Sequence, residues 1–172
     1  GLDKAFSVLL PDGADSERIY VKVSTDENEK VAVLNRDLRV IIPPKYKSIE
    51  DFGDKPLTIF KDGNDAGLID TNGNEAMRIP CQNPKHYSEK DDLLLCVPNL
   101  YNRRGESHFT TGIYVSDVFE VPGSPITLIQ FQGEGTQKGI MTLAGQIIVP
   151  AEHEWANVIT AGEQSFIQLK TT

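Results

Sequence analysis

The sequence predicts an all-β protein built from tandem repeats, and three observations support this fold class. Short apolar runs recur along the chain between glycine, proline, asparagine and aspartate, which is typical of strands and turns. One phrase of two apolar runs closed by a proline returns several times. The closing prolines stand at positions 11, 43, 80, 122 and 150, so the period averages about 35 residues. A period in this range is the mark of a repeat architecture.

The fullest copy of the phrase is Lys30–Pro44. Two apolar runs, Val31–Leu34 and Val40–Ile42, flank a polar link, and Pro43 follows the second run. This order predicts a β-hairpin whose second strand stops at the proline, because proline has no N–H to donate to a sheet. We expect one buried face to hold Val40, Ile42 and, in the last copy, Ile147 and Val149. The other copies are a fragment at Ser7–Pro11 and the segments Gly67–Pro80, Gly112–Pro122 and Gly139–Pro150.

A third strand is expected after each hairpin. The first is Leu57–Phe60, and in the partial opening unit the strand is Ile19–Val23, whose apolar residues alternate with a period of two. Helix is expected only at Pro150–Trp155, where proline and two acids suit one helical turn. The remaining third strands are Leu93–Val97, Ile126–Phe131 and Phe166–Leu169.

We therefore expect a single β-repeat domain over residues 1–172. It consists of a partial capping unit at 1–28 and repeat units at 29–65, 66–110, 111–137 and 138–172. Each unit should supply three antiparallel strands and cover its neighbour's apolar face, because one such unit cannot bury its own. The units would stack into a curved sheet. That array is either open and solenoid-like or closed on itself, and the sequence leaves both alternatives open.

The phrase resembles the WG-repeat family, also written KWG. Its units run Lys-Trp-Gly, two apolar residues and Asp, then a glycine turn, an apolar pair, Pro-Pro, Tyr and Ile. Ala66–Asp70 with Asn72–Gly73 matches the opening half of this unit. Val40–Pro44, followed by Tyr46 and Ile49, matches the closing half. The resemblance implies a bacterial β-repeat module that serves in interactions and has no shared enzymatic activity, so it supplies no catalytic residues.

The chain departs from the family pattern at the residue that names it. Lys138–Pro150 matches both halves of the unit loosely, and the chain's single tryptophan, Trp155, lies after the last closing proline. Elsewhere the tryptophan position is occupied by other residues, so these units are degenerate. The replacing residues are Val31, Ala66, Thr111 and Lys138.

The charge balance limits the classes of partner. A formal net charge of −8 argues against nucleic acid, which requires a basic face. No apolar run approaches the roughly 20 residues of a membrane-spanning helix, so the chain is not expected to span a membrane. The chain starts with Gly1 rather than methionine, and we expect a natural leader that has been removed. This favours an extracytoplasmic protein, periplasmic or on the cell surface.

The two cysteines, Cys81 and Cys96, allow two alternatives. Each lies in or beside an apolar run, so they are either joined in a disulfide or buried as free thiols. Neither has the CxxC spacing of a redox or zinc site.

No motif indicates a catalytic residue, a metal site or a cofactor. Asp70–Glu75 clusters oxygen ligands around a glycine, but the spacing differs from a calcium loop, and Asn72–Gly73 predicts a tight hairpin turn instead. His153 stands between two carboxylates, yet alternate residues of a strand face opposite ways, so a surface cluster with Trp155 in the core is expected. His86 and His108 lie in separate connections without a nucleophile motif.

The long connection Asn99–Thr111 is the clearest candidate for an interaction surface. Arg103 and Arg104 stand there near Tyr101 and Phe109, and arginine and aromatic residues are enriched in protein interfaces. An ordinary polar loop is the alternative. The complete expected surface consists of Tyr46, Tyr101, Arg103, Arg104, Phe109 and Trp155.

These observations predict a non-catalytic module that binds another protein. A carbohydrate-binding protein of the cell surface is the second hypothesis, and a hydrolase with carboxylate or histidine chemistry is the third. Exposure of the aromatic residues separates the first two hypotheses, because sugar rings stack on exposed aromatic faces. The discriminating residues are Tyr46, Tyr87, Tyr101 and Trp155.

Overall fold

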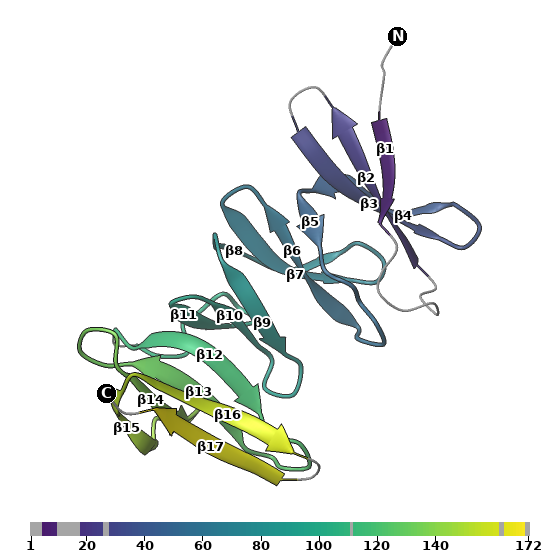
Figure 1. Cartoon of the computed structure of the whole chain (residues 1–172). Helices are drawn as coiled ribbons and strands as arrows, with labels where there is room; N and C mark the ends of the chain where they lie inside the picture. The colour runs from purple at the N-terminus through teal and green to yellow at the C-terminus, as the bar shows by residue number, and fades with distance from the viewer. Residues whose placement is uncertain (1–4, 10–17, 26–27, 111, 162–163, 171–172) are drawn as a thin grey trace. The chain divides into compact units, whose positions relative to one another are not determined.

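A computed structural model describes residues 5–9, 18–25, 28–110, 112–161 and 164–170. In these residues the regular secondary structure consists of strands, so the predicted all-β class is confirmed (Figure 1). The described residues contain no helix with the length and apolar character needed to cross a membrane. Residues 10–17, which include Pro11 of the opening fragment, lie outside the described ranges.

The strands form five antiparallel sheets, each a meander of consecutive strands. The first contains β1 (Ala5–Leu9), β2 (Arg18–Thr25), β3 (Asn28–Asn35) and β4 (Val40–Tyr46). The second contains β5 (Ser48–Ile49), β6 (Leu57–Asp62), β7 (Asp65–Asp70) and β8 (Glu75–Pro80). The third contains β9 (Pro84–Ser88), β10 (Leu93–Cys96) and β11 (Asn99–Asn102). The fourth contains β12 (Tyr114–Glu120), β13 (Thr127–Gln132), β14 (Lys138–Thr142) and β15 (Ile147–His153). The fifth is the hairpin of β16 (Trp155–Ala161) and β17 (Gln164–Lys170).

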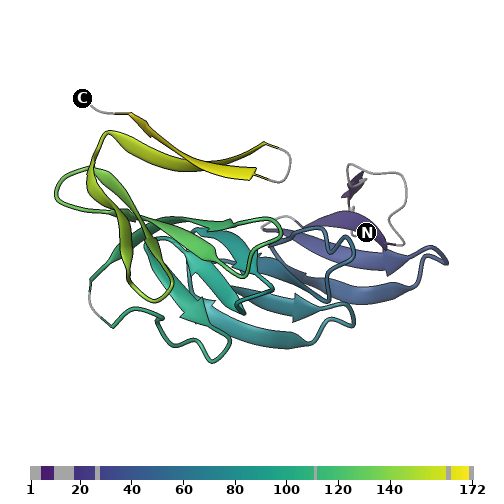
Figure 2. The same cartoon turned by 90° about the horizontal axis from the view of Figure 1, so that it is seen from below.

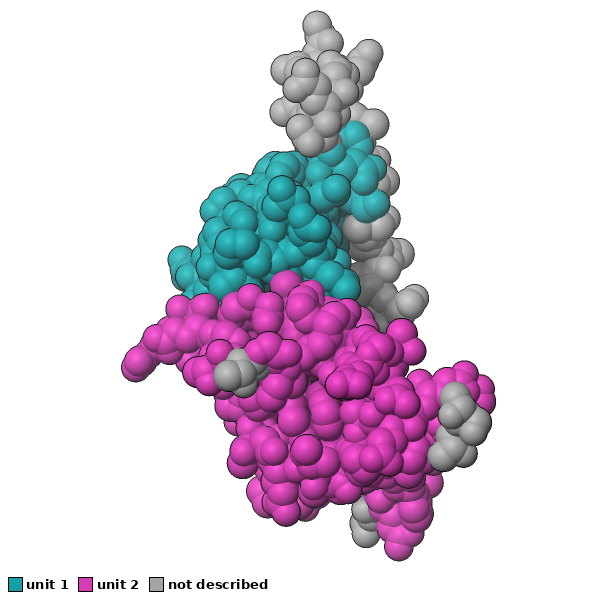
Figure 3. Space-filling view, turned by 90° about the vertical axis from the view of Figure 1, so that its left-hand side faces the viewer, with its two compact units in different colours: residues 1–84 teal, residues 85–172 magenta. Residues whose placement is uncertain are grey.

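The chain divides into two compact units, residues 1–84 and 85–172 (Figure 3). The first and second sheets belong to the first unit. The fourth sheet and the β16–β17 hairpin belong to the second, with β9 starting at the boundary. The solenoid-like or closed array expected from the sequence stays a prediction.

Three of the sheets have four strands rather than the expected three. The additional strand is the first of each meander: β1, β5 and β12. β5 at Ser48–Ile49 lies between the predicted strands Val40–Ile42 and Leu57–Phe60. The hairpin expected at Gly112–Pro122 is instead one strand, β12, which pairs with β13 from Tyr114 to Glu120. The expectation of a hairpin there was wrong, because the polar Ser116–Asp117 pair forms a bulge rather than a turn.

Pro43 and Pro150 do not stop their strands as predicted. β4 continues through Pro43 and Pro44 to Tyr46, and β15 continues through Pro150 to His153. Both are the last strands in the order of their sheets. Proline is tolerated on such an edge because its missing N–H can face away from the neighbouring strand. The prediction of a helical turn at Pro150–Trp155 is also wrong, because β15 extends through Pro150 to His153.

A bulge recurs in the last strand of the three four-stranded sheets. In β4 the pairing shifts between Leu34↔Val40 and Val33↔Ile42. The bulge inserts one extra residue, so residues two apart no longer share a face. Ile42 is therefore buried at 1% exposure, whereas Val40 is 59% exposed. The same shift occurs in β8, between Ile69↔Glu75 and Leu68↔Met77, and in β15, between Met141↔Ile147 and Ile140↔Val149.

The prediction that both residues of each pair are buried is therefore confirmed for one residue and wrong for the other. Ile42 and Val149 are buried as predicted, but Val40 and Ile147 are exposed. The bulge is the physical reason for the difference.

One turn geometry recurs four times, beginning at Asn35, Asp70, Asn102 and Thr142. In each, the N–H of the first residue donates to the carbonyl four residues later, and the N–H of the fourth residue donates back to the first. The side-chain oxygen of the first residue also accepts the N–H four residues on. The turn predicted at Asn72–Gly73 is confirmed as one of these.

The fourth residue of this turn has positive φ in all four copies. It is glycine three times, at Gly73, Gly105 and Gly145, and leucine once, at Leu38 with φ of 61°. A leucine in the left-handed region carries strain because its Cβ crowds the backbone. The side chain of Leu38 is exposed, so little packing offsets that strain.

We expect Leu38→Gly to raise the free energy of unfolding by about 0.5–1 kcal/mol, since relief of strain exceeds the entropic cost of glycine. Urea unfolding followed by circular dichroism measures the change. Leu38→Ala is the matched control, because alanine removes the side chain and keeps the strain. An equal gain from both variants would contradict the explanation by backbone strain.

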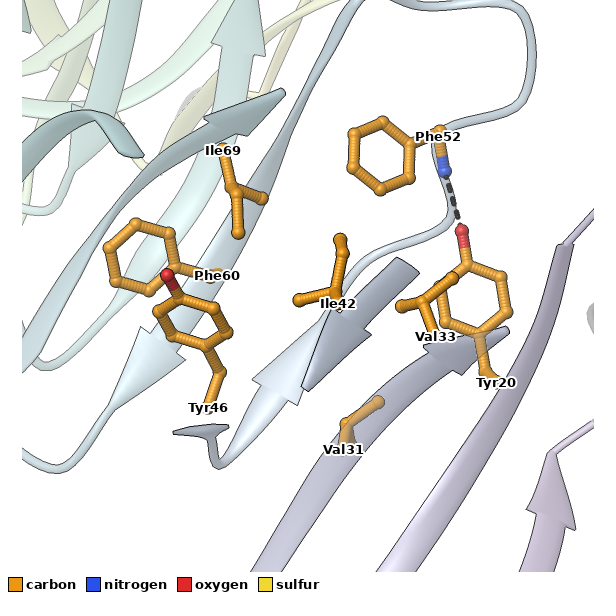
Figure 4. Packing of buried hydrophobic residues seen from close by; sticks show 8 residues of the cluster. All are labelled: Tyr20, Val31, Val33, Ile42, Tyr46, Phe52, Phe60 and Ile69. Atoms are coloured by element: carbon orange, nitrogen blue, oxygen red, sulfur yellow. Dashed lines mark hydrogen bonds between the residues drawn. The ribbon is translucent and has the colours of Figure 1, made fainter. Parts of the chain in front are cut away.

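The core of the first unit joins its two sheets (Figure 4). Tyr46 of β4 lies against Phe60 of β6, with ring centroids 4.5 Å apart. The Tyr20 hydroxyl donates to Asp51 Oδ1 at 2.9 Å and accepts the Phe52 N–H at 3.1 Å. Burial, supported by Asp51, raises the pKa of Tyr20 to about 12. The cluster consists of Tyr20, Val31, Val33, Ile42, Tyr46, Phe52, Phe60 and Ile69.

Described residues of the second unit form at least two buried clusters. One joins the β9–β11 sheet to the inner face of the β12–β15 sheet and includes Leu95, Leu100 and Ile129. The other lies between the β12–β15 sheet and the β16–β17 hairpin, and includes Ile140 and Ala156. The hairpin thus packs one face against the preceding sheet as a separate layer (Figure 2).

Candidate functional site

The Asn99–Thr111 connection places Arg103 and Arg104 side by side in sequence but in different environments. Arg103 Nε donates to Asp92 Oδ1 at 2.9 Å, and a terminal nitrogen of the same guanidinium lies 3.3 Å from the Tyr87 hydroxyl. Asp92 is the main reason that the pKa of Arg103 is raised. Arg103 is thereby tethered to β9 and to the turn before β10. Arg104 is exposed, and its guanidinium has no hydrogen-bond partner among the described residues.

The aromatic residues of this connection are half-buried. Tyr101 lies on β11 opposite Leu94 of β10. Phe109 packs against the buried cluster of the second unit, and its ring meets His108 edge-on at 4.8 Å. His108 Nε2 lies 3.0 Å from the Leu143 carbonyl oxygen. Because a carbonyl oxygen can only accept, the imidazole donates this hydrogen bond. The connection therefore gathers four of the six predicted surface residues but fixes most of them by internal contacts.

The other two predicted residues lie elsewhere. Tyr46 is 1% exposed in the core of the first unit, so this side chain is not available at a surface. The prediction for Tyr46 is wrong, because β4 continues through the two prolines and places this side chain in the core. Trp155 is half-buried at the start of β16. Tyr87 is also buried, with its hydroxyl donating to Asp92 Oδ1 at 2.8 Å.

A network of charges on the first unit was not found from the sequence. Arg78 of β8 forms a two-point contact with Glu75, with Nε 2.8 Å from Oε2 and a terminal nitrogen 3.0 Å from Oε1. The Tyr46 hydroxyl donates to the same Glu75 carboxylate at 2.9 Å, and Lys45 contacts it as well. The guanidinium of Arg78 stacks 4.9 Å from the centre of the Phe60 ring. Charged residues are too frequent in this chain for the sequence to single these out.

The network satisfies its members internally and joins β4 to β8. The contact with Arg78 is the main cause that lowers the pKa of Glu75 to about 2, and Lys45 and Tyr46 add to the effect. Further contacts of Arg78 reach Asp62 at 3.3 Å and Asp65 at 3.2 Å. Such an arrangement stabilises the fold and keeps the Glu75 carboxylate charged near neutral pH.

The low pKa of Glu75 predicts a dependence of stability on pH. Its ordinary value is 4.5, so its stabilising contribution is complete above that pH and is lost as the pH falls towards about 2. We expect Glu75→Gln to lower the free energy of unfolding by about 1–2 kcal/mol near pH 6, after allowance for solvent screening. The difference between the two proteins should shrink at about pH 2.5, where the native carboxylate is partly protonated. Urea unfolding at both pH values measures it, and a difference independent of pH would contradict the assignment.

The histidines have different surroundings. His86 Nε2 lies 3.7 Å from Glu120 Oε1, and His153 Nδ1 is enclosed without a hydrogen-bond partner among the described residues. Within the ranges that the structure describes, no three His, Cys, Asp or Glu side chains are grouped closely enough to hold a metal ion.

Both cysteines are disulfide-bonded, and neither is a free thiol. Of the two alternatives that the sequence left open, the structure has the disulfide. Disulfides persist in oxidising compartments and are rare in the reducing cytosol.

A surface that the sequence did not reveal lies on the outer face of the β16–β17 hairpin. Ile159 and Phe166 are directly opposite each other there and are 42% and 48% exposed. Because side chains alternate along a strand, Trp155 of β16 shares this face. Asn157 and Gln168 form the polar pair between them. We call this set, Trp155, Asn157, Ile159, Phe166 and Gln168, the hairpin outer face.

No sequence signal marked this face, because Phe166–Leu169 reads as a buried third strand.

The chain matches no protein-family model and no curated protein.

Proposed function

We propose that this protein is a non-catalytic module that binds another protein through the hairpin outer face. The observation that carries the proposal is the directly opposed pair Ile159 and Phe166, both exposed on a two-stranded sheet. Isolated exposed apolar side chains are ordinary, but a directly opposed pair forms a contiguous apolar patch, and Trp155 lies on the same face beyond the polar pair Asn157 and Gln168. Aromatic and aliphatic anchors of this kind dominate the energy of protein interfaces.

The contrast with the predicted Arg103–Arg104 surface supports this choice. Arg103 is bound by Asp92 and Tyr87, so binding a partner there would first require breaking internal contacts. Arg104 is exposed in that loop, and we propose that it offers a positive charge to the partner. The acidic net charge of −8 makes a partner with some basic character favourable for association.

We also propose that the chain is a degenerate WG-type tandem repeat, with one four-stranded meander as its unit. The recurring turn and the recurring bulge support this, since unrelated hairpins have no reason to share both. The disulfide-bonded cysteines support an extracytoplasmic location.

Photo-crosslinking tests the binding proposal. The photoreactive residue p-benzoylphenylalanine at position 166 should form discrete, protease-sensitive adducts with a protein from the source organism's extract. Ile159→Asp should abolish them while leaving the circular dichroism spectrum unchanged. The matched control carries the photoreactive residue at Ile126, which is also exposed in the second unit but lies outside the hairpin. Equal adducts from both positions would overturn the proposal.

Carbohydrate binding is the second candidate, because Trp155 shares the hairpin outer face with the opposed amides of Asn157 and Gln168. Burial of Tyr46 and Tyr87 removes two of the four aromatic residues on which it depended. Trp155 is the single tryptophan, so its fluorescence reports on this face alone. A saturable change in Trp155 fluorescence on addition of soluble glycans, which protein ligands do not reverse, would favour carbohydrate binding over protein binding.

A further inference from the structure

Asn72 and Gly73 lie in the turn between β7 and β8, and the sequence contains no other asparagine followed by glycine. The Asn72 side chain is exposed, and its amide has no hydrogen-bond partner among the described residues. Such an amide can be attacked by the backbone nitrogen of the next residue, and glycine has no Cβ to obstruct the approach. The turn therefore holds both partners of a reaction that alters the backbone.

The other three copies of the recurring turn lack this combination. Their third and fourth residues are Asp37 and Leu38, Arg104 and Gly105, and Ala144 and Gly145. In the first of these pairs a leucine Cβ crowds the backbone nitrogen. In the other two, neither arginine nor alanine carries a side-chain carbonyl group that the nitrogen could attack. The β7–β8 turn is thus the copy in which the reaction can occur.

Asp70 holds the turn in its folded conformation. Its Oδ1 accepts the Asn72 N–H at 2.9 Å and the Asn74 N–H at 2.8 Å. Its backbone carbonyl accepts the Gly73 N–H at 3.0 Å, so the nitrogen that would attack is engaged in a hydrogen bond. Approach of this nitrogen to Asn72 Cγ requires rotation of the peptide between Asn72 and Gly73, which breaks that bond. The turn must therefore open before the reaction can start.

We propose that Asn72 is a site of spontaneous deamidation whose rate is controlled by opening of the β7–β8 turn. Hydroxide removes the amide proton of Gly73, and the nitrogen bonds to Asn72 Cγ while the Cγ–Nδ2 bond breaks and ammonia leaves with a proton from water. Water then opens the cyclic imide. Cleavage of the new N–Cγ bond gives aspartate. Cleavage between the nitrogen and the main-chain carbonyl carbon of residue 72 gives isoaspartate, whose main chain runs through the side chain and gains a methylene group.

The added methylene group disturbs packing inside the first unit. Gly73 lies close to β4, since a Cβ at this position would be 3.3 Å from Ile42 Cγ1. Ile42 belongs to the buried cluster that joins the two sheets of the unit. A longer main chain in the turn displaces Gly73 from this contact and breaks the hydrogen bonds to Asp70. Deamidation to isoaspartate therefore loosens the contact between the β7–β8 turn and β4, whereas aspartate leaves the main chain unchanged.

Incubation of the intact protein in mildly alkaline ¹⁸O-labelled water tests the proposal. Peptide mass spectrometry should locate the incorporated ¹⁸O at residue 72, and fragmentation should distinguish isoaspartate from aspartate there. The capped peptide of residues 70–75, DTNGNE, should react roughly tenfold faster than the folded protein or more, because nothing holds its turn closed. Absence of ¹⁸O at residue 72, or equal rates for peptide and protein, would overturn the proposal.

Three variants test control by the turn. Asp70→Ala should accelerate the reaction roughly threefold or more, because it removes the side-chain hydrogen bonds that hold the turn. Asp70→Asn should react like the parent, since asparagine occupies this position in two other copies of the turn. Gly63→Ala, which strains a different turn of the same unit, should also leave the rate unchanged.

Equal acceleration by Asp70→Ala and Gly63→Ala would overturn control by the turn, because it would show that stability of the whole unit sets the rate. The purified isoaspartate form provides the last comparison. It should unfold at a lower urea concentration than Asn72→Asp, which carries the same charge on an unaltered main chain. Equal midpoints for the two would overturn the predicted loosening of the contact with β4.

Discussion

Ile42→Ala is expected to lower the free energy of unfolding by about 2–5 kcal/mol, the range for a large aliphatic residue removed from a packed core. Ile42 is 1% exposed and contacts the cluster that joins the two sheets of the first unit. Its deletion leaves a cavity between β4 and β6, which neighbouring side chains fill only in part. Urea unfolding followed by circular dichroism measures the loss.

The matched control for this variant lies two residues away in the same strand. Val40→Ala should change stability by no more than about 0.5 kcal/mol, because Val40 is exposed beyond the bulge of β4. A sheet without the bulge would place both residues on one face and make the two losses similar. Similar losses would therefore contradict the position of the bulge.

Gly67→Ala is expected to lower the free energy of unfolding by about 3 kcal/mol, at the upper end of what overpacking costs. A Cβ at this position would lie 1.9 Å from the Met77 carbonyl oxygen, which belongs to the backbone of the neighbouring strand β8. A backbone atom cannot rotate away as a side chain can, so β7 and β8 must separate. That separation disturbs the pairing that holds Met77 and Ile79 in the core.

Two other glycines provide controls for Gly67. Gly112→Ala should be neutral to within about 0.5 kcal/mol, because no described atom beyond its two chain neighbours lies within 4 Å of its Cβ position. Gly63→Ala should cost about 1 kcal/mol, because its space is open but its φ is positive. Chemical unfolding of the three variants under the same conditions ranks their losses in free energy of unfolding. A loss at Gly67 no larger than that at Gly63 would show that close strand approach is not the reason for this glycine.

Much of the strand content follows directly from sequence patterns. The apolar run Leu57–Phe60 lies in β6, the run Leu93–Val97 forms β10 as far as Cys96, and Asn72–Gly73 lies in a turn. These elements depend on local chemistry: alternation or continuity of apolar residues, and glycine where φ is positive. Such signals are contained within a few residues and survive any tertiary arrangement.

The errors arose where local chemistry is decided by the neighbouring strands. A proline stops a central strand but not an edge strand, and the sequence does not say that β4 and β15 are edges. The bulge that exposes Val40 depends on the register between β3 and β4, which no single segment contains. The hairpin outer face was missed because Phe166–Leu169 has the sequence of a buried strand, whereas Phe166 is exposed.

The measurement that tests the account most directly is native-state amide hydrogen exchange of β13 and β17, compared residue by residue. These strands have matching side chains, yet β13 lies between two partners and β17 has one among the described strands. We predict protection at successive residues of β13 and, in β17, protection at every second residue only. Uniform protection along β17 would contradict its pairing with β16 alone among the described strands.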